Sequence, residues 1–114
     1  MCYVYILKCA DGSYYTGYTP DLCRRMRAHV SGKGSKYTHA HPPAALAAIW
    51  RCEDAAAARR LEYAIKKQLS RSEKEQLIAA QDTVNGKFPQ LEGLHYEPLS
   101  GVTLEDCLEG KVYG

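Results

Sequence analysis

The chain lacks the long apolar segments and targeting signals that mark membrane-bound or exported proteins. None of its apolar runs approaches the roughly 20 residues that a membrane-spanning helix needs. The N-terminus has neither the basic stretch nor the small-residue cleavage site of a signal peptide. With 114 residues, of which 46% are apolar and 25% charged, the composition is typical of one globular domain. We therefore expect a cytoplasmic protein.

Cysteine pairs at the spacing of a metal or redox site are also missing. The chain has five cysteines, an odd number, and none of them forms a CxxC motif. A secreted disulfide framework typically has an even number of cysteines, and a zinc ribbon has CxxC pairs. We therefore expect reduced cysteines that act as small, mostly buried apolar side chains. They are Cys2, Cys9, Cys23, Cys52 and Cys107.

No single sign of charge dominates, but the two parts of the chain differ. Residues 1–80 hold 13 Lys/Arg and 7 Asp/Glu, a balance of +6, whereas residues 81–114 hold 2 and 6, a balance of −4. The first part is a candidate polyanion binder, although a mixed charged surface is also normal. The second part reads as an acidic, partly ordered C-terminal tail. It could recruit a protein partner or compete with nucleic acid for the basic part. It could also have no regulatory effect, as a solvating tail or a packed edge element.

The first twenty residues predict a β-hairpin. Residues 2–9 (CYVYILKC) contain β-forming side chains without a helical period, and residues 13–18 (SYYTGY) follow the turn signal Asp11-Gly12. A two-residue turn would place Tyr5 and Tyr15 on opposite faces of the sheet. A three-residue loop with a left-handed Gly12 instead pairs Cys9 with Ser13 and brings both tyrosines to one face.

The remaining pattern predicts helices and one more strand, hence an α+β fold with a three-stranded antiparallel sheet in the order β-β-α-β-α-α. We expect a first helix after the cap Thr19-Pro20, with Leu22, Met26 and Val30 on its apolar stripe. A loop over 31–44 and a strand over 46–52 would follow. The last two elements would be a helix over 55–69 capped by Asp54 and a helix opened by Ser70. These elements would form one domain over residues 1–80.

Two residues on the first predicted helix are candidates for a functional site. Arg25 and His29 are four residues apart, so their side chains project from one face beside the apolar stripe. A half-desolvated position of this kind suits an active site. The alternative is that both residues are solvated surface side chains.

Two further positions have a structural and a functional interpretation. Gly17 lies within the second predicted strand, where a glycine often marks the close approach of another group. Glu62 follows the buried Leu61 on the long helix and could bind a metal ion. A salt bridge from Glu62 to Arg59 or Lys66 is the simpler alternative.

Taken together, these residues resemble the GIY-YIG nuclease domain. Residues 3–5 (YVY) stand where that family has its first triplet, and residues 15–17 (YTG) stand for the second. Arg25 and His29 match the family's arginine and following histidine, and Glu62 falls where the family keeps its metal-binding glutamate. Neither triplet is literal, but both tyrosines and the second glycine are kept. The resemblance implies that both tyrosines face one cleft, so we expect the three-residue loop, in which Gly17 lies opposite Tyr5 and leaves room beside it. The resemblance covers about residues 2–80 and is strongest to small stand-alone bacterial members.

The resemblance implies hydrolysis of nucleic-acid phosphodiester bonds with Mg²⁺ or Mn²⁺. Glu62 would bind the metal ion, and Arg25 would bind the nonbridging phosphate oxygens. Tyr5, with a pKa lowered by nearby cations, would orient or deprotonate the attacking water. Tyr15 and His29 would complete the catalytic set. The residues expected to contact nucleic acid are Gly17, Lys33, Lys36, Tyr37, Thr38 and His39.

Other possibilities remain open at this stage. His39 and His41 could be ligands of a zinc ion, but no cysteine or third histidine lies nearby at the spacing of a zinc site. The scaffold could also be a non-catalytic nucleic-acid-binding module, although no catalytic residue is lost. A domain this small has little surface for sequence readout. We therefore expect a structure-directed endonuclease of DNA repair or recombination, with DNA favoured over RNA.

Overall fold

Strand β1 (Cys2–Cys9) lies at the centre of a four-stranded antiparallel sheet. It pairs with β2 (Tyr14–Thr19) and β3 (Pro43–Cys52), and β4 (Glu97–Pro98) pairs with β3, in the order β2-β1-β3-β4. The structure is a computed structural model that describes residues 1–110. None of the helices within that range has the length and apolar character needed to cross a membrane.

The prediction of three strands was wrong because β4 has no strand signature of its own. This two-residue strand lies in the segment that was expected to be a tail, and Glu97 pairs with Arg51 of β3. The Glu97 carboxylate also accepts a hydrogen bond from Nε of Arg51 at 3.1 Å. Backbone pairing with β3 and the Arg51–Glu97 ion pair therefore define this strand, and no local sequence pattern predicts it.

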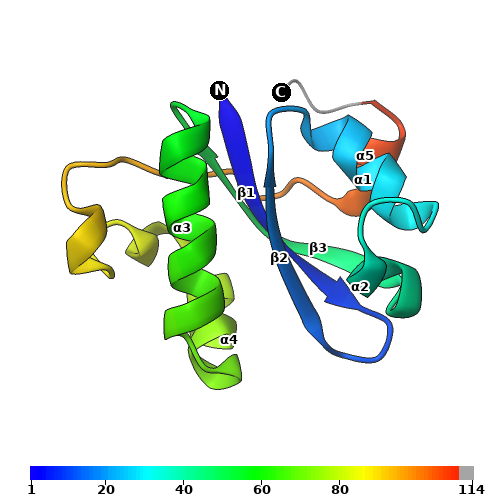
Figure 1. The fold of residues 1–114 in the computed structure, drawn as a ribbon, viewed down its shortest axis with the longest axis horizontal. Helices are drawn as coiled ribbons and strands as arrows, with labels where there is room; N and C mark the ends of the chain where they lie inside the picture. The colour runs from blue at the N-terminus through cyan, green and yellow to red at the C-terminus, as the bar shows by residue number, and fades with distance from the viewer. Residues whose placement is uncertain (111–114) are drawn as a thin grey trace.

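The sheet carries a helical layer on each face (Figure 1). Val4 and Ile6 of β1 face one layer, built mainly on α3 (Ala55–Gln68) and α4 (Arg71–Ala79). Tyr3, Tyr5 and Leu7 face the other, built on α1 (Leu22–Val30). Because successive strand residues point to opposite faces, a strand covered on both sides is apolar throughout. The edge strand β2 lies between α1 and α3, where the two layers meet.

The register of the hairpin is the one predicted for a three-residue loop. The backbone N–H of Cys9 donates to the Ser13 carbonyl at 2.8 Å, and Gly12 has φ +86°. Tyr5 lies opposite Gly17, and Tyr15 lies opposite Leu7. Both tyrosines therefore lie on one face, as expected.

Helix α1 begins two residues later than predicted. Its cap is Asp21, whose side chain accepts from the Arg24 N–H at 3.2 Å, whereas Thr19 remains the last residue of β2. The Thr19 hydroxyl instead accepts from the Asp21 N–H at 3.1 Å and closes a local turn. The apolar stripe also differs, because His29 is buried and Val30 is 46% exposed.

The expected loop 31–44 contains a short helix, α2 (Lys36–Ala40). The Ser35 side chain caps it by accepting from the Thr38 N–H at 3.1 Å. The two later helices agree with prediction, since Asp54 caps α3 and Ser70 opens α4 with a full capping box.

The segment after Ala80 is packed against the body, in contrast to the expected tail. It contains η1 (Gln81–Val84), η2 (Pro89–Leu91), β4 and α5 (Leu104–Leu108). Its apolar side chains join both layers of the core. Val84, Phe88, Leu91 and Tyr96 pack on the α3 side, and Leu104 and Cys107 on the α1 side. The apolar residues follow no helical or strand period, which is why the sequence pattern missed this packing. The last part of the segment, residues 111–114, lies outside the described range.

The five cysteines are thiols with no disulfide among the described residues. Four of them are buried, and Cys23 is partly exposed. This agrees with their expected role as small apolar side chains.

Candidate active site

Two buried side chains from different elements meet beneath the edge strand. The Tyr5 hydroxyl of β1 lies 2.6 Å from Nε2 of His29 on α1. Neither residue exposes measurable surface, at 0% each. His29 reaches this position because it follows Leu22 and Met26 on the buried face of α1. The alternative of a solvated His29 is therefore excluded by its position.

The second nitrogen of His29 is held by α2. Nδ1 lies 2.8 Å from the hydroxyl of Thr38, and this hydroxyl lies 2.9 Å from that of Ser35. Burial, with the nearby Arg25 charge, lowers the pKa of His29 to about 4, so the ring is neutral at pH 7. A neutral imidazole donates from one nitrogen only. If Nδ1 donates to Thr38, Nε2 is left to accept the Tyr5 proton.

Two glycines allow these groups to approach. A Cβ on Gly17 would lie 2.5 Å from the Tyr5 hydroxyl. A Cβ on Gly34 would lie 2.4 Å from Nδ1 of His29 and 2.9 Å from its Cα. Both contacts are far closer than carbon atoms tolerate, so any larger residue would displace Tyr5 or His29. The prediction that Gly17 leaves room beside Tyr5 is confirmed.

A cleft of about 330 Å³ runs along β2. Four of the five predicted catalytic residues line it, namely Tyr5, Tyr15, Arg25 and Glu62. His29 lies behind Tyr5 and is not among the lining residues. Since Tyr5 is covered by its neighbours, a side chain above it must shift before water can reach its hydroxyl.

The electrostatics of the cleft differ from one expectation. Burial raises the pKa of Tyr5 to about 12, and the adjacent Arg25 guanidinium opposes this effect only in part. The predicted lowering of this pKa is therefore wrong for the protein without substrate, because desolvation outweighs the nearby cation. The Tyr5 hydroxyl keeps its proton at neutral pH.

Arg25 is positioned to bind an additional oxygen. It is half-buried, and its Nε has no hydrogen-bond partner among residues 1–110. A buried guanidinium nitrogen without an acceptor is costly, so an incoming anion would relieve that cost.

Glu62 has the chemistry that a hard divalent cation requires. Its side chain is 22% exposed, and it is the only carboxylate among the described residues that line the cleft. Its Oε1 lies 3.8 Å from Nζ of Lys66, the salt bridge that was the simpler alternative. This contact is long and partly exposed, so it is weak and leaves the carboxylate available. One carboxylate with water in the remaining positions suits Mg²⁺. No cluster of three or more His, Cys, Asp or Glu that could hold a metal ion occurs within residues 1–110.

The six residues predicted to contact nucleic acid differ in their positions, and Gly17 is among the residues that line the cleft. Lys33, Lys36 and His39 are exposed and could reach a ligand. Thr38 is only 1% exposed and supports His29, so its assignment as a nucleic-acid contact is corrected.

Tyr37 was expected to contact nucleic acid, but its ring already has partners in the protein. The ring stacks on His41, with centroids 4.3 Å apart, and on Tyr15 at 5.7 Å. His41 in turn contacts the carboxylate of Asp11 at 2.5 Å. Bonds from Ser13 and His41 hold the pKa of Asp11 far below its ordinary value.

Sequence reasoning missed Gly34 and Ser35 beside the catalytic candidates, and it missed one contact of Lys66. Gly34 and Ser35, with Thr38, hold the outer side of His29. A capping signal at Ser35 could have predicted α2, but no local signal predicts its contact with His29. Lys66 was considered only as a salt-bridge partner, yet its Nζ also lies 5.5 Å from the Tyr15 ring centroid.

Comparison with known proteins gives a consistent result. The GIY-YIG catalytic domain family matches residues 1–76. The UPF0213 protein BH0048 of Halalkalibacterium halodurans is 53% identical over 68% of this chain and 81% of its own length. A UPF0213 protein of Halobacterium salinarum is 47% identical over 68% of this chain and its entire length. The solution NMR structure of BH0048 is 51% identical, covers 71% of this chain and 86% of that chain, and has a TM-score of 0.47.

Proposed function

The chain belongs to the GIY-YIG family, and on that premise we propose that it is a divalent-metal-dependent endonuclease of nucleic-acid phosphodiester bonds. One observation carries the proposal. Tyr5, Tyr15, Arg25 and Glu62 line a single cleft, and the hydroxyl of Tyr5 is hydrogen-bonded to a neutral His29. An acid–base pair, a cation and a metal-binding carboxylate are the groups that phosphodiester hydrolysis requires.

Proton transfer would run through Tyr5 to His29. A water molecule attacks phosphorus and gives its proton to the Tyr5 oxygen, while the Tyr5 hydroxyl gives its own proton to Nε2 of His29. The new P–O bond forms as the bond to the 3′ oxygen breaks. Because burial raises the pKa of Tyr5 and lowers that of His29, a preformed tyrosinate–imidazolium pair would be unfavourable. We therefore place both proton transfers in the same step as the attack.

Arg25 would hold the phosphate during this step. Its charged guanidinium lies beside Tyr5 at the wall of the cleft, and its free Nε can donate to a nonbridging oxygen. An anion bound there would also offset the Arg25 charge that disfavours protonation of His29. Substrate binding would thus make His29 a better proton acceptor.

Glu62 would hold Mg²⁺ or Mn²⁺ together with water molecules. When bound, the cation supplies charge stabilisation for the departing 3′ oxygen. Tyr15, whose ring lies near both His29 and Lys66, would close the other side of the cleft.

We favour DNA over RNA as the substrate, and branched or interrupted structures of repair and recombination over a specific sequence. The small domain supports recognition of structure over sequence, since it offers little area for reading base edges.

The test is incubation with labelled branched, duplex and single-stranded DNA and RNA, in Mg²⁺ or in EDTA. Cleavage that requires Mg²⁺ and disappears in the Glu62→Ala variant is the expected result. A wild-type protein that binds the panel but never cuts would replace the nuclease proposal with the nucleic-acid-binding alternative.

A further inference from the structure

Helix α3 presents a continuous basic and aromatic surface that begins at Glu62. At about 100° per residue, Lys66, Arg59 and Tyr63 lie roughly 40°, 60° and 100° around the helix from Glu62, on the side away from the buried face. Lys67 and Arg60 follow at roughly 140° and 160°. Glu62 is the only acidic residue in the α3 sequence. We call Arg59, Arg60, Tyr63, Lys66 and Lys67 the α3 arc.

The far part of this arc borders a groove of about 500 Å³ against η2. Its lining residues are Ala56, Arg59, Arg60, Tyr63, Gln90 and Leu91, and none of them is acidic. Arg60 is held at the groove by donating to the Gln90 carbonyl at 2.6 Å. The lining of the groove is therefore apolar at Leu91 and Ala56 and cationic at Arg59 and Arg60.

Tyr63 is the most exposed aromatic side chain in residues 1–110, at 61%. A large ring left in water offers an apolar face on which a planar group can stack. Arg59 precedes Tyr63 by one helical turn, and Lys67 follows it by one turn, so both cations lie beside the ring.

We infer that the α3 arc binds the unpaired strand of the substrate as it leaves the cleft, with a base stacked on Tyr63 and phosphates on Arg59 and its cationic neighbours. The inference deepens the proposed function and rests on it. Charge complementarity favours a polyanion, and the exposed ring favours unpaired bases, whose faces are open for stacking. In a duplex the same faces are covered by neighbouring base pairs.

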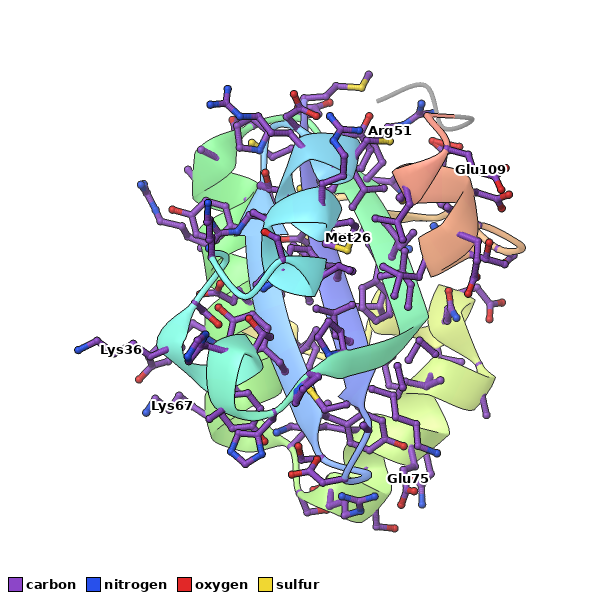
Figure 2. All side chains as sticks on the ribbon, turned by 90° about the vertical axis from the view of Figure 1, so that its right-hand side faces the viewer. Met26, Lys36, Arg51, Lys67, Glu75 and Glu109 are labelled. Atoms are coloured by element: carbon purple, nitrogen blue, oxygen red, sulfur yellow. The ribbon has the colours of Figure 1, made fainter. Side chains whose placement is uncertain are left out.

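The position of the arc fits this role. Because the arc starts at the cleft residue Glu62, a strand bound in the cleft can continue along α3 without crossing an acidic surface. Lys36 of α2 and Lys67 of α3 extend toward the same side of the molecule (Figure 2), so cations from both elements face that side. The protein would then prefer substrates with a single-stranded segment next to the cut.

The test compares two labelled substrates in EDTA, a blunt duplex and the same duplex with an overhang of about ten nucleotides. Fluorescence anisotropy measures their affinities for wild type, Tyr63→Ala and Tyr63→Phe. Tyr63→Ala should weaken overhang binding by about 5- to 150-fold, the range for loss of one base–aromatic stack. It should leave blunt-duplex binding unchanged, and Tyr63→Phe should bind the overhang like wild type. Arg59→Ala should lower the salt dependence of overhang binding by about 0.7 in log–log slope, whereas Lys74→Ala on α4 should not.

The outcomes separate this inference from the nuclease proposal. If wild type cuts but Tyr63→Ala binds the overhang as tightly as wild type, the inference is overturned and the nuclease remains. If overhang binding depends on Tyr63 but no substrate is ever cut, the α3 arc is still a single-strand-binding surface and the nuclease proposal fails. Equal losses on both substrates would assign Tyr63 to general binding and also overturn the inference. The variants should fold, since Tyr63 is exposed.

Discussion

The Tyr5 hydroxyl lies 2.6 Å from Nε2 of His29, with both side chains buried between the sheet and α1. Thr38 holds the opposite nitrogen of the same ring at 2.8 Å. Tyr5, His29 and Thr38 thus join β1, α1 and α2 through two hydrogen bonds, and a neutral His29 donates one of them and accepts the other.

Replacing Tyr5 by phenylalanine removes the hydroxyl and keeps the ring. If Tyr5 relays the proton of the attacking water, Tyr5→Phe should slow cleavage by about 10²–10⁴ with little change in substrate affinity. Tyr15→Phe is the matched control from the same cleft. Single-turnover cleavage and binding in EDTA measure the two effects separately. A Tyr5→Phe enzyme as fast as wild type, with a slow Tyr15→Phe, would exchange the two roles.

Removing the Thr38 hydroxyl should release His29 without creating a cavity. Thr38→Val keeps the shape but cannot accept from Nδ1, so the ring can adopt the tautomer that donates toward Tyr5. We expect single-turnover cleavage to fall by about 10-fold or more, while Thr38→Ser retains most of the rate. A merely structural role would predict equal losses for the two variants or a change in affinity alone.

His29 also makes stability depend on pH. Its pKa is lowered from 6.5 to about 4, so the unfolded chain binds more protons in that interval. The free energy of unfolding should therefore fall as pH drops from about 6.5 to about 4, by roughly 3 kcal/mol in total. Urea denaturation across this range should show a shallower pH slope for His29→Gln. Comparing wild type with His29→Gln cancels the pH dependence that other groups contribute to stability. One such group is Asp11, whose lowered pKa affects stability at more acidic pH. Equal slopes would show that His29 is not a buried neutral imidazole.

Changing Glu62 tests the metal site independently of the proton relay. Glu62→Gln keeps the size of the side chain but is a much weaker ligand for Mg²⁺, so cutting should be lost or require far more metal. Nucleic-acid binding in EDTA should be retained or slightly tighter, because a negative charge leaves a cleft that holds Arg25. Lys66→Met removes the salt-bridge partner but keeps the carboxylate, so it should cut with the wild-type metal dependence. Its nucleic-acid binding should be weaker, because Lys66 belongs to the α3 arc. Cleavage by Glu62→Gln with the wild-type metal dependence would remove Glu62 from the site.

The sequence predicted those parts of the fold that depend on local chemistry. The hairpin register followed from the resemblance, which implies that Tyr5 and Tyr15 lie on one face of the sheet. Only the three-residue loop places them there, because successive strand residues alternate between the two faces. The caps at Asp54 and Ser70 were also predictable, because each side chain bonds a backbone N–H three residues later.

The rest depends on contacts between distant segments. The start of α1 was predicted two residues too early because Thr19 and Asp21 are both good helix caps. In the structure Asp21 caps the helix, and Thr19 is the last residue of β2. The role of Thr38 depends on where α2 meets His29, which no spacing encodes. The raised pKa of Tyr5 depends on burial, and the adjacent cation alone suggested the opposite direction.

Truncation after Ala80 should unfold the protein, so it cannot test whether the acidic segment competes with nucleic acid. The deletion would expose the core surface that six buried apolar side chains now cover, and burial of such a side chain contributes roughly 1.5–3 kcal/mol. The sum is comparable to the roughly 5–15 kcal/mol of a whole domain. Trp50 would also lose the Gln81 carbonyl that its Nε1–H donates to at 2.8 Å. Circular dichroism during heating should show no cooperative transition for residues 1–80, and Phe88→Ala in the full chain should lower the midpoint without abolishing it. A cooperative transition near that of the full chain would show that the segment is an appendage, and its effect on nucleic-acid affinity at low salt could then be measured directly.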